Sequence, residues 1–178
     1  MQVMVDVEAF GTDSFGLITQ IGGLYFDEDK KNYDMFVVNV NINDSLDNGF
    51  KVTGDTLKWW FERKPTFLKN TVSVSKALQM FKDFLKPALK KEMNIWAHSF
   101  DYKILSDAYY LIKQKLPFSY RQTMDIRTLT TLTKNLGMPF IKVNECEKTH
   151  DALDDCKYQV IYVCNCLKYL KEGKYNVQ

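Results

Sequence analysis

Four acidic residues and one histidine could together bind divalent cations and cleave a phosphodiester bond. They are Asp6 and Glu8 near the start of the chain, Asp101 in the middle, and His150 and Asp155 near the end. Carboxylate oxygens are the ligands that Mg²⁺ and Mn²⁺ prefer. An imidazole with an ordinary pKa of about 6.5 can accept a proton at neutral pH. These residue types therefore predict metal-dependent phosphodiester hydrolysis.

Asp6 and Glu8 lie in a segment, residues 2–8, in which valines alternate with other residues. Such alternation predicts a strand with both carboxylates on one face, so that both can reach one cation. Neighbouring carboxylates repel each other and resist desolvation, which favours a site where a cation neutralises them. The same motif also fits an edge strand with a solvated acidic face, so the motif alone does not decide between the two.

The segment that begins at His150 predicts a long amphipathic helix over residues 151–170. Its apolar stripe recurs at steps of three and four residues: Ala152, Cys156, Val160, Val163, Leu167 and Leu170. At about 100° per residue, Asp155 falls on the flank of this stripe and Asp154 falls opposite it. Asp151 fits the N-cap of this helix, and Asp154, an acidic residue in the first turn, complements the helix dipole. Capping gives no role to His150.

Asp101 comes shortly after a mostly apolar segment, residues 93–98, which predicts a short strand. A helix should come next, because its apolar positions are Phe100, Ile104, Leu105, Ala108, Leu111 and Ile112. Asp101 then stands between the carboxyl end of a strand and the start of a helix, where α/β folds collect functional groups. A first-turn acidic residue that complements the helix dipole would occupy the same position.

In this order, D-x-E on a first strand, F-D opening a middle helix and H-x-x-x-x-D opening a late helix resemble the DEDDh, or DnaQ-like, 3′-to-5′ exonucleases. Segments 56–60, 125–128 and 150–156 are similar to phage-encoded members of this superfamily that degrade single-stranded DNA. Family members commonly carry Asn near the position of His98, and Thr soon after the Glu of the first motif, where this chain has Ala9 and Phe10. These departures concern substrate contacts rather than metal ligands.

The resemblance implies two divalent ions, Mg²⁺ or Mn²⁺. Asp6, Glu8 and Asp155 would hold one ion, and Asp6 with Asp101 the other, so that the attacking and leaving oxygens are both stabilised. His150 would act as general base toward the attacking water. Nucleoside 5′-monophosphates would be released from the 3′ end.

Aromatic and basic residues supply candidates for substrate binding. Stacking of a base on an aromatic ring is worth ~1 to 3 kcal/mol. Neighbouring residues of a helix point about 100° apart, so one of Trp59 and Trp60 is expected to pack inward while the other faces the substrate. The candidate substrate contacts are Phe10, Trp60, His98, Phe100 and Arg127. Most lysines fit solvated helix faces, and only Lys103 is added as a phosphate contact.

The fold class predicted is α/β, and the resemblance implies a ribonuclease-H-like fold. Alternating segments predict a three-stranded antiparallel meander within a mixed central sheet flanked by helices. The expected strands are 2–8, 16–27, 33–41, 93–98 and a short one near 119–124. The expected helices are 55–62, 73–89, 100–114, 125–135 and 151–170. The Asn- and Asp-rich segment 41–54 is expected to be a loop.

Composition fits one globular exonuclease domain over residues 1–178. Apolar residues make up 46% of the chain, which excludes a disordered protein. The sequence lacks the ~20 apolar residues of a membrane span and the pattern of a signal peptide, so a cytoplasmic protein is expected, in a host cell if the gene is viral. Cys146, Cys156, Cys164 and Cys166 show no metal-site spacing and are expected to be reduced thiols.

Three functions remain open from the sequence. The favoured one is an exonuclease for single-stranded DNA, and the first alternative is an exoribonuclease that trims short RNA or RNA 3′ ends. The net charge of +2 does not distinguish them, because it attracts either polyanion only weakly. The third is a non-catalytic nucleic-acid-binding module, which would have no need of a full acidic set. No protein partner can be inferred from the sequence.

Overall fold

A mixed five-stranded sheet forms the centre of the molecule. The computed structural model describes residues 1–29, 32–63, 65, 68–139 and 150–173. The strands are β1 (Gln2–Ala9), β2 (Ile18–Phe26), β3 (Asn32–Asn39), β4 (Ile95–Ala97) and β5 (Thr123–Asp125). In the order β3-β2-β1-β4-β5, the first three are antiparallel neighbours, whereas β4 runs parallel to both β1 and β5. The predicted meander and mixed sheet are confirmed.

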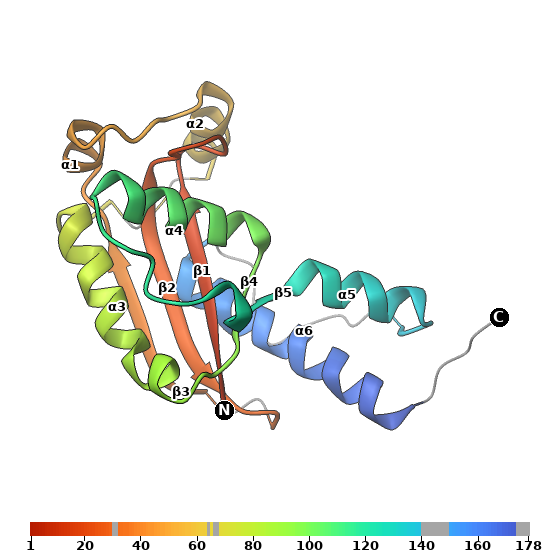
Figure 1. The fold of residues 1–178 in the computed structure, drawn as a ribbon. Helices are drawn as coiled ribbons and strands as arrows, with labels where there is room; N and C mark the ends of the chain where they lie inside the picture. The colour runs from red at the N-terminus through yellow and green to blue at the C-terminus, as the bar shows by residue number, and fades with distance from the viewer. Residues whose placement is uncertain (30–31, 64, 66–67, 140–149, 174–178) are drawn as a thin grey trace.

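Helices cover both faces of this sheet. They are α1 (Ile42–Asp47), α2 (Gly54–Phe61), α3 (Val74–Lys90), α4 (Ser99–Leu111), α5 (Ile126–Asn135) and α6 (Ala152–Glu172). Figure 1 shows α4 crossing one face of the strands and α6 crossing the other, with α5 beside α6. The helices α1 and α2 lie at the end of the sheet where β1 finishes (Figure 1). The carboxyl end of β1 is therefore surrounded by α2, α4 and the start of α6.

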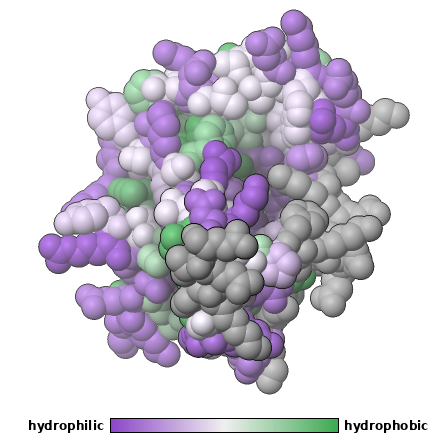
Figure 2. All heavy atoms as spheres, turned by 90° about the vertical axis from the view of Figure 1, so that its right-hand side faces the viewer, coloured by the Kyte–Doolittle hydropathy of each residue, from purple (hydrophilic) through white to green (hydrophobic). Residues whose placement is uncertain are grey.

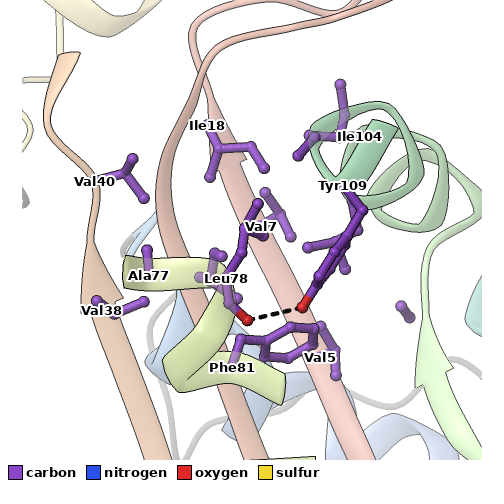
Figure 3. Close-up of a cluster of buried hydrophobic side chains, with 14 of the residues drawn as sticks. Val5, Val7, Ile18, Val38, Val40, Ala77, Leu78, Phe81, Ile104 and Tyr109 are labelled. Carbon is purple, nitrogen blue, oxygen red and sulfur yellow. Dashed lines mark hydrogen bonds between the residues drawn. The ribbon is translucent and has the colours of Figure 1, made fainter. Parts of the chain in front are cut away.

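The alternation of β1 divides the core into two clusters. Val3, Val5 and Val7 are buried beneath α3 and α4, where Figure 3 shows Val5 and Val7 among side chains of several elements. In the same cluster, the hydroxyl of Tyr109 donates a hydrogen bond of 2.8 Å to the carbonyl of Leu78 and so joins α4 to α3. Even-numbered positions of β1 face the smaller cluster beneath α6. The core thus fixes which face of β1 carries Asp6 and Glu8.

Tyr25 forms hydrogen bonds to the backbone of α3 next to Pro87. Pro87 lies inside this helix and interrupts its hydrogen-bond ladder, because proline has no N–H and its ring crowds the preceding turn. The Tyr25 hydroxyl donates to the carbonyl of Phe84 at 2.9 Å and accepts from the N–H of Ala88 at 3.2 Å. One side chain of β2 therefore bridges two groups that would pair directly in a regular helix, and it holds α3 against the sheet.

The segment 41–54 differs from the expected loop, because it contains α1. Asn41 caps this helix by accepting a hydrogen bond from the N–H of Asp44, and the carboxylate of Asp44 accepts from the N–H of Val74. The Asn and Asp residues that suggested a loop thus serve as a cap and a tertiary contact. Residues 120–122 also differ from the prediction, since they form a 3₁₀ turn before β5 begins at Thr123.

The described cysteines agree with the expectation of reduced thiols. Cys156, Cys164 and Cys166 are buried and carry no disulfide, while Cys146 lies outside the described residues. Within the described ranges, no helix combines the length and the apolar character needed to cross a membrane. Figure 2 shows mostly hydrophilic side chains on the face that bears α5 and α6, with smaller hydrophobic areas between them.

Candidate active site

Asp6 and Glu8 lie on the α6 side of the central strand β1. Both are buried, with 7% and 9% of their surface exposed. On the neighbouring strand β2, Asp6 stands opposite Gly22 and Glu8 stands opposite Gln20. An edge strand with a solvated acidic face is therefore wrong for this motif, since β1 is covered on both faces. Two carboxylates buried this close need a compensating positive charge.

Gln20 fastens the start of α6 to the sheet. Its carbonyl oxygen accepts a hydrogen bond of 2.7 Å from the N–H of Ala152, and its amide nitrogen donates to the carboxylate of Asp151 at 3.0 Å. Asp151 also accepts from the N–H groups of Leu153 and Asp154, which confirms its predicted role as N-cap. The beginning of α6 is thus held beside the strand pair that carries Glu8.

Gly22 allows α6 to approach the sheet closely. A Cβ atom at this position would lie 2.4 Å from the carbonyl carbon of Ala152 and 2.5 Å from its oxygen. These are backbone atoms that no side-chain rotation can move away. Glycine is therefore required opposite Asp6 if the first turn of α6 is to reach the acidic residues of β1.

Asp155 is the inward carboxylate of α6. It is buried with 4% exposed, whereas Asp154 is half-buried and its carboxylate pairs with the ammonium group of Lys157 at 2.8 Å. This difference follows from the helical periodicity predicted for the segment. Asp155 also lies one residue before Cys156, whose thiol pKa is raised by burial and by the charges of Asp6 and Asp101. That thiol is consequently held protonated.

Asp101 enters the same region from the first turn of α4. It is buried, and its carboxylate accepts a hydrogen bond of 2.9 Å from the N–H of His98, the residue that precedes the helix. The first-turn role is therefore present, in addition to any role in a metal site. Burial raises the pKa of Asp101 well above its ordinary value, and the negative charges of Asp6 and Glu8 add to this effect. The acidic residues therefore form one interacting set.

His150 completes the cluster from the residue before the N-cap of α6. Among the described residues, ligand atoms of Glu8, His150 and Asp155 all lie within 4.8 Å of one another. The backbone of His150 has φ of 56°, in the left-handed region, so surrounding contacts must hold it there. Its ring packs edge-on against Trp59, with centroids 4.6 Å apart, and lies 6.1 Å from Trp60. Two tryptophans of α2 thus confine the imidazole.

The expected substrate contacts are placed unequally. Trp60 is buried, donates its indole N–H to the carbonyl of Ala9 at 2.9 Å and packs against Phe10, which is also buried. This burial disfavours Trp60 as a stacking surface for a base, because its neighbours are already protein atoms. Trp59, which was not among the predicted contacts, is half-buried. The guanidinium of Arg63 lies 3.7 Å from the centroid of its ring. The prediction that Trp60 faces the substrate is therefore wrong: Trp60 packs inward, and Trp59 is the more exposed of the two.

Three other candidates differ in their burial. His98 is half-buried and, with Asp155, lines a cleft of about 190 Å³ between the start of α4 and the helices α5 and α6. Phe100 is half-buried against the core, and Arg127 is exposed in the first turn of α5. Lys103 contacts Asp107 at 2.6 Å, so this lysine already has an anionic partner.

Comparison with known proteins gives a match to one family model. Residues 1–167 match the family model of the 3'-5' exoribonuclease Rv2179c-like domain. The chain belongs to this family. Its membership confirms the predicted DEDDh-type 3′-5′ exonuclease superfamily, so the chain is a 3′-5′ exonuclease domain, a hydrolase that acts on nucleic acids. The closer likeness to phage-encoded enzymes stays a prediction. Among curated proteins, none matches this chain.

Solved structures confirm the ribonuclease-H-like fold. An exonuclease I from Methylocaldum szegediense superposes with a TM-score of 0.71 and 14% identity over 97% of this chain, which spans only 41% of that protein. Pop2p of S. pombe, with Mg²⁺ and Mn²⁺ bound, has a TM-score of 0.60 and 14% identity, and the match covers 97% of this chain and 84% of Pop2p. Exonuclease X in complex with 5′ overhanging duplex DNA has a TM-score of 0.56 and 13% identity, and the match covers 94% of this chain and 92% of exonuclease X.

Proposed function

We propose that this domain removes nucleoside 5′-monophosphates from the 3′ end of single-stranded nucleic acid by a mechanism that uses two divalent ions. The observation that carries the proposal is the meeting of five groups from three elements. Asp6 and Glu8 come from β1, Asp101 from α4 and Asp155 from the first turn of α6, while His150 stands just before the N-cap of that helix. A module that only bound nucleic acid would have no use for such a buried acidic set.

The donor set fits Mg²⁺ or Mn²⁺. It consists of buried carboxylates, which are hard oxygen ligands, and the pKa of Asp101 is raised by burial and, to a smaller extent, by the negative charges of Asp6 and Glu8. Asp6, Glu8 and Asp155 would hold one ion, and Asp6 with Asp101 the second. When bound, the ions would neutralise these carboxylates and stabilise charge on the attacking and leaving oxygens.

His150 is proposed as the general base. One imidazole nitrogen would accept the proton of the attacking water, while Trp59 packs against the ring and keeps it beside Glu8 and Asp155. The distances would also allow His150 to be a metal ligand, and the resemblance to DEDDh enzymes favours the base. A His150→Ala variant that keeps its Mn²⁺ affinity but loses turnover would support the base over the ligand.

Trp59 is the proposed stacking surface beside the site. Trp59 is half-buried and adjoins His150, and the guanidinium of Arg63 lies against its ring. The pair therefore offers an aromatic ring and a positive charge to single-stranded nucleic acid. DNA is favoured by the similarity of segments 56–60 and 150–156 to phage exonucleases. RNA is the second candidate, because the matched family is described as a 3'-5' exoribonuclease.

The test compares end-labelled single-stranded DNA, single-stranded RNA and duplexes of equal length, each with Mg²⁺, Mn²⁺ or EDTA. We expect stepwise shortening from the 3′ end, release of 5′-monophosphates and no reaction in EDTA. Asp155→Asn should abolish the reaction, whereas Asp154→Asn is the matched control and should stay close to wild type. Full activity in EDTA, or equal damage by the two substitutions, would exclude the proposed site.

A further inference from the structure

We propose that Gln159 is a positioning residue that orients the carboxylate of Asp6 for cation binding. The amide nitrogen of Gln159 donates a hydrogen bond of 2.7 Å to Oδ1 of Asp6, across 153 positions of sequence. Both side chains are buried, with 8% and 7% exposed. The inference rests on the proposed function, in which Asp6 is the ligand shared by both ions.

The orientation of the amide follows from its neighbours. A carboxylate can only accept hydrogen bonds, so it requires the nitrogen of Gln159 and would repel the oxygen if the amide were turned over. Within the part of the chain that the structure describes, the buried Oε1 of Gln159 has no hydrogen-bond donor. The contact with Asp6 is therefore the polar interaction that fixes this amide.

One helix consequently supplies both a ligand and the group that orients another ligand. Gln159 stands four residues after Asp155, so the two side chains lie on the same face of α6, one turn apart. Docking α6 on the sheet delivers the Asp155 carboxylate and the Gln159 donor together. Terminal rotation of a carboxylate is otherwise broad, and hydrogen bonds from outside the ligand set are what restrict it.

The contact is suited to a metal site more than to stability alone. A hydrogen bond to an ionised carboxylate is stronger than one between neutral groups. An amide donor adds no charge, so it restrains Asp6 without competing with a cation for the negative charge, as a lysine or arginine at this position would. Gln159 therefore orders the ligand and leaves the site anionic.

The test measures Mn²⁺ binding to the whole protein by titration calorimetry in the absence of nucleic acid. Gln159→Met keeps the length of the side chain and removes the donor, and Gln159→Ala is the second variant in case methionine disturbs folding. The matched control is Gln122→Leu, at a half-buried position before β5. It removes the hydrogen bond of 3.2 Å that the Gln122 amide nitrogen donates to the carbonyl of Met93. Melting temperatures are recorded with EDTA and with Mn²⁺.

We expect the Gln159 variants to bind Mn²⁺ about 10- to 100-fold more weakly and to gain less melting temperature from it. Gln122→Leu should lower the melting temperature by the same amount with and without Mn²⁺ and keep the wild-type affinity. Wild-type affinity in either folded Gln159 variant would overturn the positioning role while leaving the exonuclease proposal intact. Failure of the wild-type protein itself to bind Mn²⁺ would instead overturn the metal site, and this inference with it.

Discussion

At the scale of single residues, Asp101 shows what the acidic set costs when no cation is present. Its pKa is raised because burial removes water from the carboxylate and because Asp6 and Glu8 are negatively charged. In the unfolded chain the same carboxyl ionises near its ordinary pKa of about 3.9. Above that pH the unfolded state releases its proton more readily than the folded state. The metal-free protein therefore loses stability as the pH rises from about 3.9 toward the raised pKa of Asp101 in the folded state.

Asp101→Asn should consequently stabilise the metal-free protein. The amide removes the buried charge, and its oxygen can still accept the hydrogen bond from the N–H of His98. In EDTA we expect the variant to melt at a higher temperature than wild type near neutral pH. The difference should vanish as the pH falls below about 3.9, where the Asp101 carboxyl of the wild type is protonated in both the folded and the unfolded protein. Thermal unfolding over a pH series measures this. A wild-type protein that is the more stable of the two in EDTA at neutral pH would contradict it.

The two histidines of the chain should differ in their contribution to turnover. His150→Ala should lower the rate of hydrolysis about 10²- to 10⁴-fold, the usual range for loss of a general base. His98→Ala should have a much smaller effect, because this residue lies at the start of α4 and lines the cleft beside Asp155. Single-turnover rates across pH measure both variants, and the acidic limb should disappear only in His150→Ala. The reverse ranking would show that the base has been assigned to the wrong residue.

At the scale of elements, the start of α6 decides whether the site forms. Gln20 holds this helix through Asp151 and Ala152, and Gly22 leaves room for its backbone. Asp6, Glu8 and Asp101 belong to β1 or α4, whereas Asp155 and the proposed base His150 reach them only when α6 docks. Helix docking and assembly of the site are therefore one event.

Gly22→Ala should separate α6 from the sheet. Its methyl group would meet backbone atoms of Ala152 at 2.4 and 2.5 Å, so we expect a loss of ~1 to 3 kcal/mol or more and a large fall in activity. Gly23→Ala is the matched control on the same strand, because its nearest contact, at 2.8 Å, is the ring of Phe84, a side chain that can adjust. Urea unfolding and nuclease assays measure both variants. Equal effects would show that the approach of α6 is not limiting.

Tyr25→Phe should weaken α3 without touching the acidic site. The substitution keeps the ring but leaves the carbonyl of Phe84 and the N–H of Ala88 without the hydroxyl that bridges them. Because such groups are costly to leave unsatisfied when buried, we expect a loss of ~1 to 3 kcal/mol in the free energy of unfolding. Chemical denaturation gives the value, and Mn²⁺ affinity should stay at the wild-type level. An unchanged unfolding midpoint would mean that these two backbone groups do not depend on the Tyr25 hydroxyl.

At the scale of the whole molecule, stability should depend on the cation. The acidic set joins β1, α4 and α6, so its mutual repulsion acts across the fold, and a bound ion would replace that repulsion with shared coordination. The small net charge of +2 means that long-range attraction to nucleic acid is weak, which leaves recognition to local contacts at the site.

Mg²⁺ or Mn²⁺ should raise the melting temperature by mass action. At a free ion concentration of about 100 times the dissociation constant, a single site adds ~2.7 kcal/mol to the free energy of unfolding. Differential scanning calorimetry against ion concentration measures the shift, EDTA should reverse it, and Ca²⁺-free buffer with Na⁺ at equal ionic strength is the control. A melting temperature that is insensitive to both divalent ions would argue against cation binding at these residues.

The local part of this architecture could be read from the sequence. Alternation put Asp6 and Glu8 on one face of a strand, the helical period separated Asp155 from Asp154, and the cap at Asp151 followed from its residue type. Each of these depends only on neighbours within one or two turns, so periodicity and capping rules suffice. The order of the acidic motifs along the chain was equally visible, and family membership confirmed the superfamily that this order resembles.

Tertiary structure decided the rest. The amides of Gln20 and Gln159, the space beside Gly22 and the burial of Trp60 in place of Trp59 depend on which distant segments meet. No periodic signal marks a glutamine that will face a carboxylate 153 positions away, or a glycine that a helix from the other end of the chain will touch. The strand or helix face of each candidate site residue therefore followed from local sequence, whereas the orientation of these side chains depends on the packing of α6 and α2 against β1, and so on the whole core.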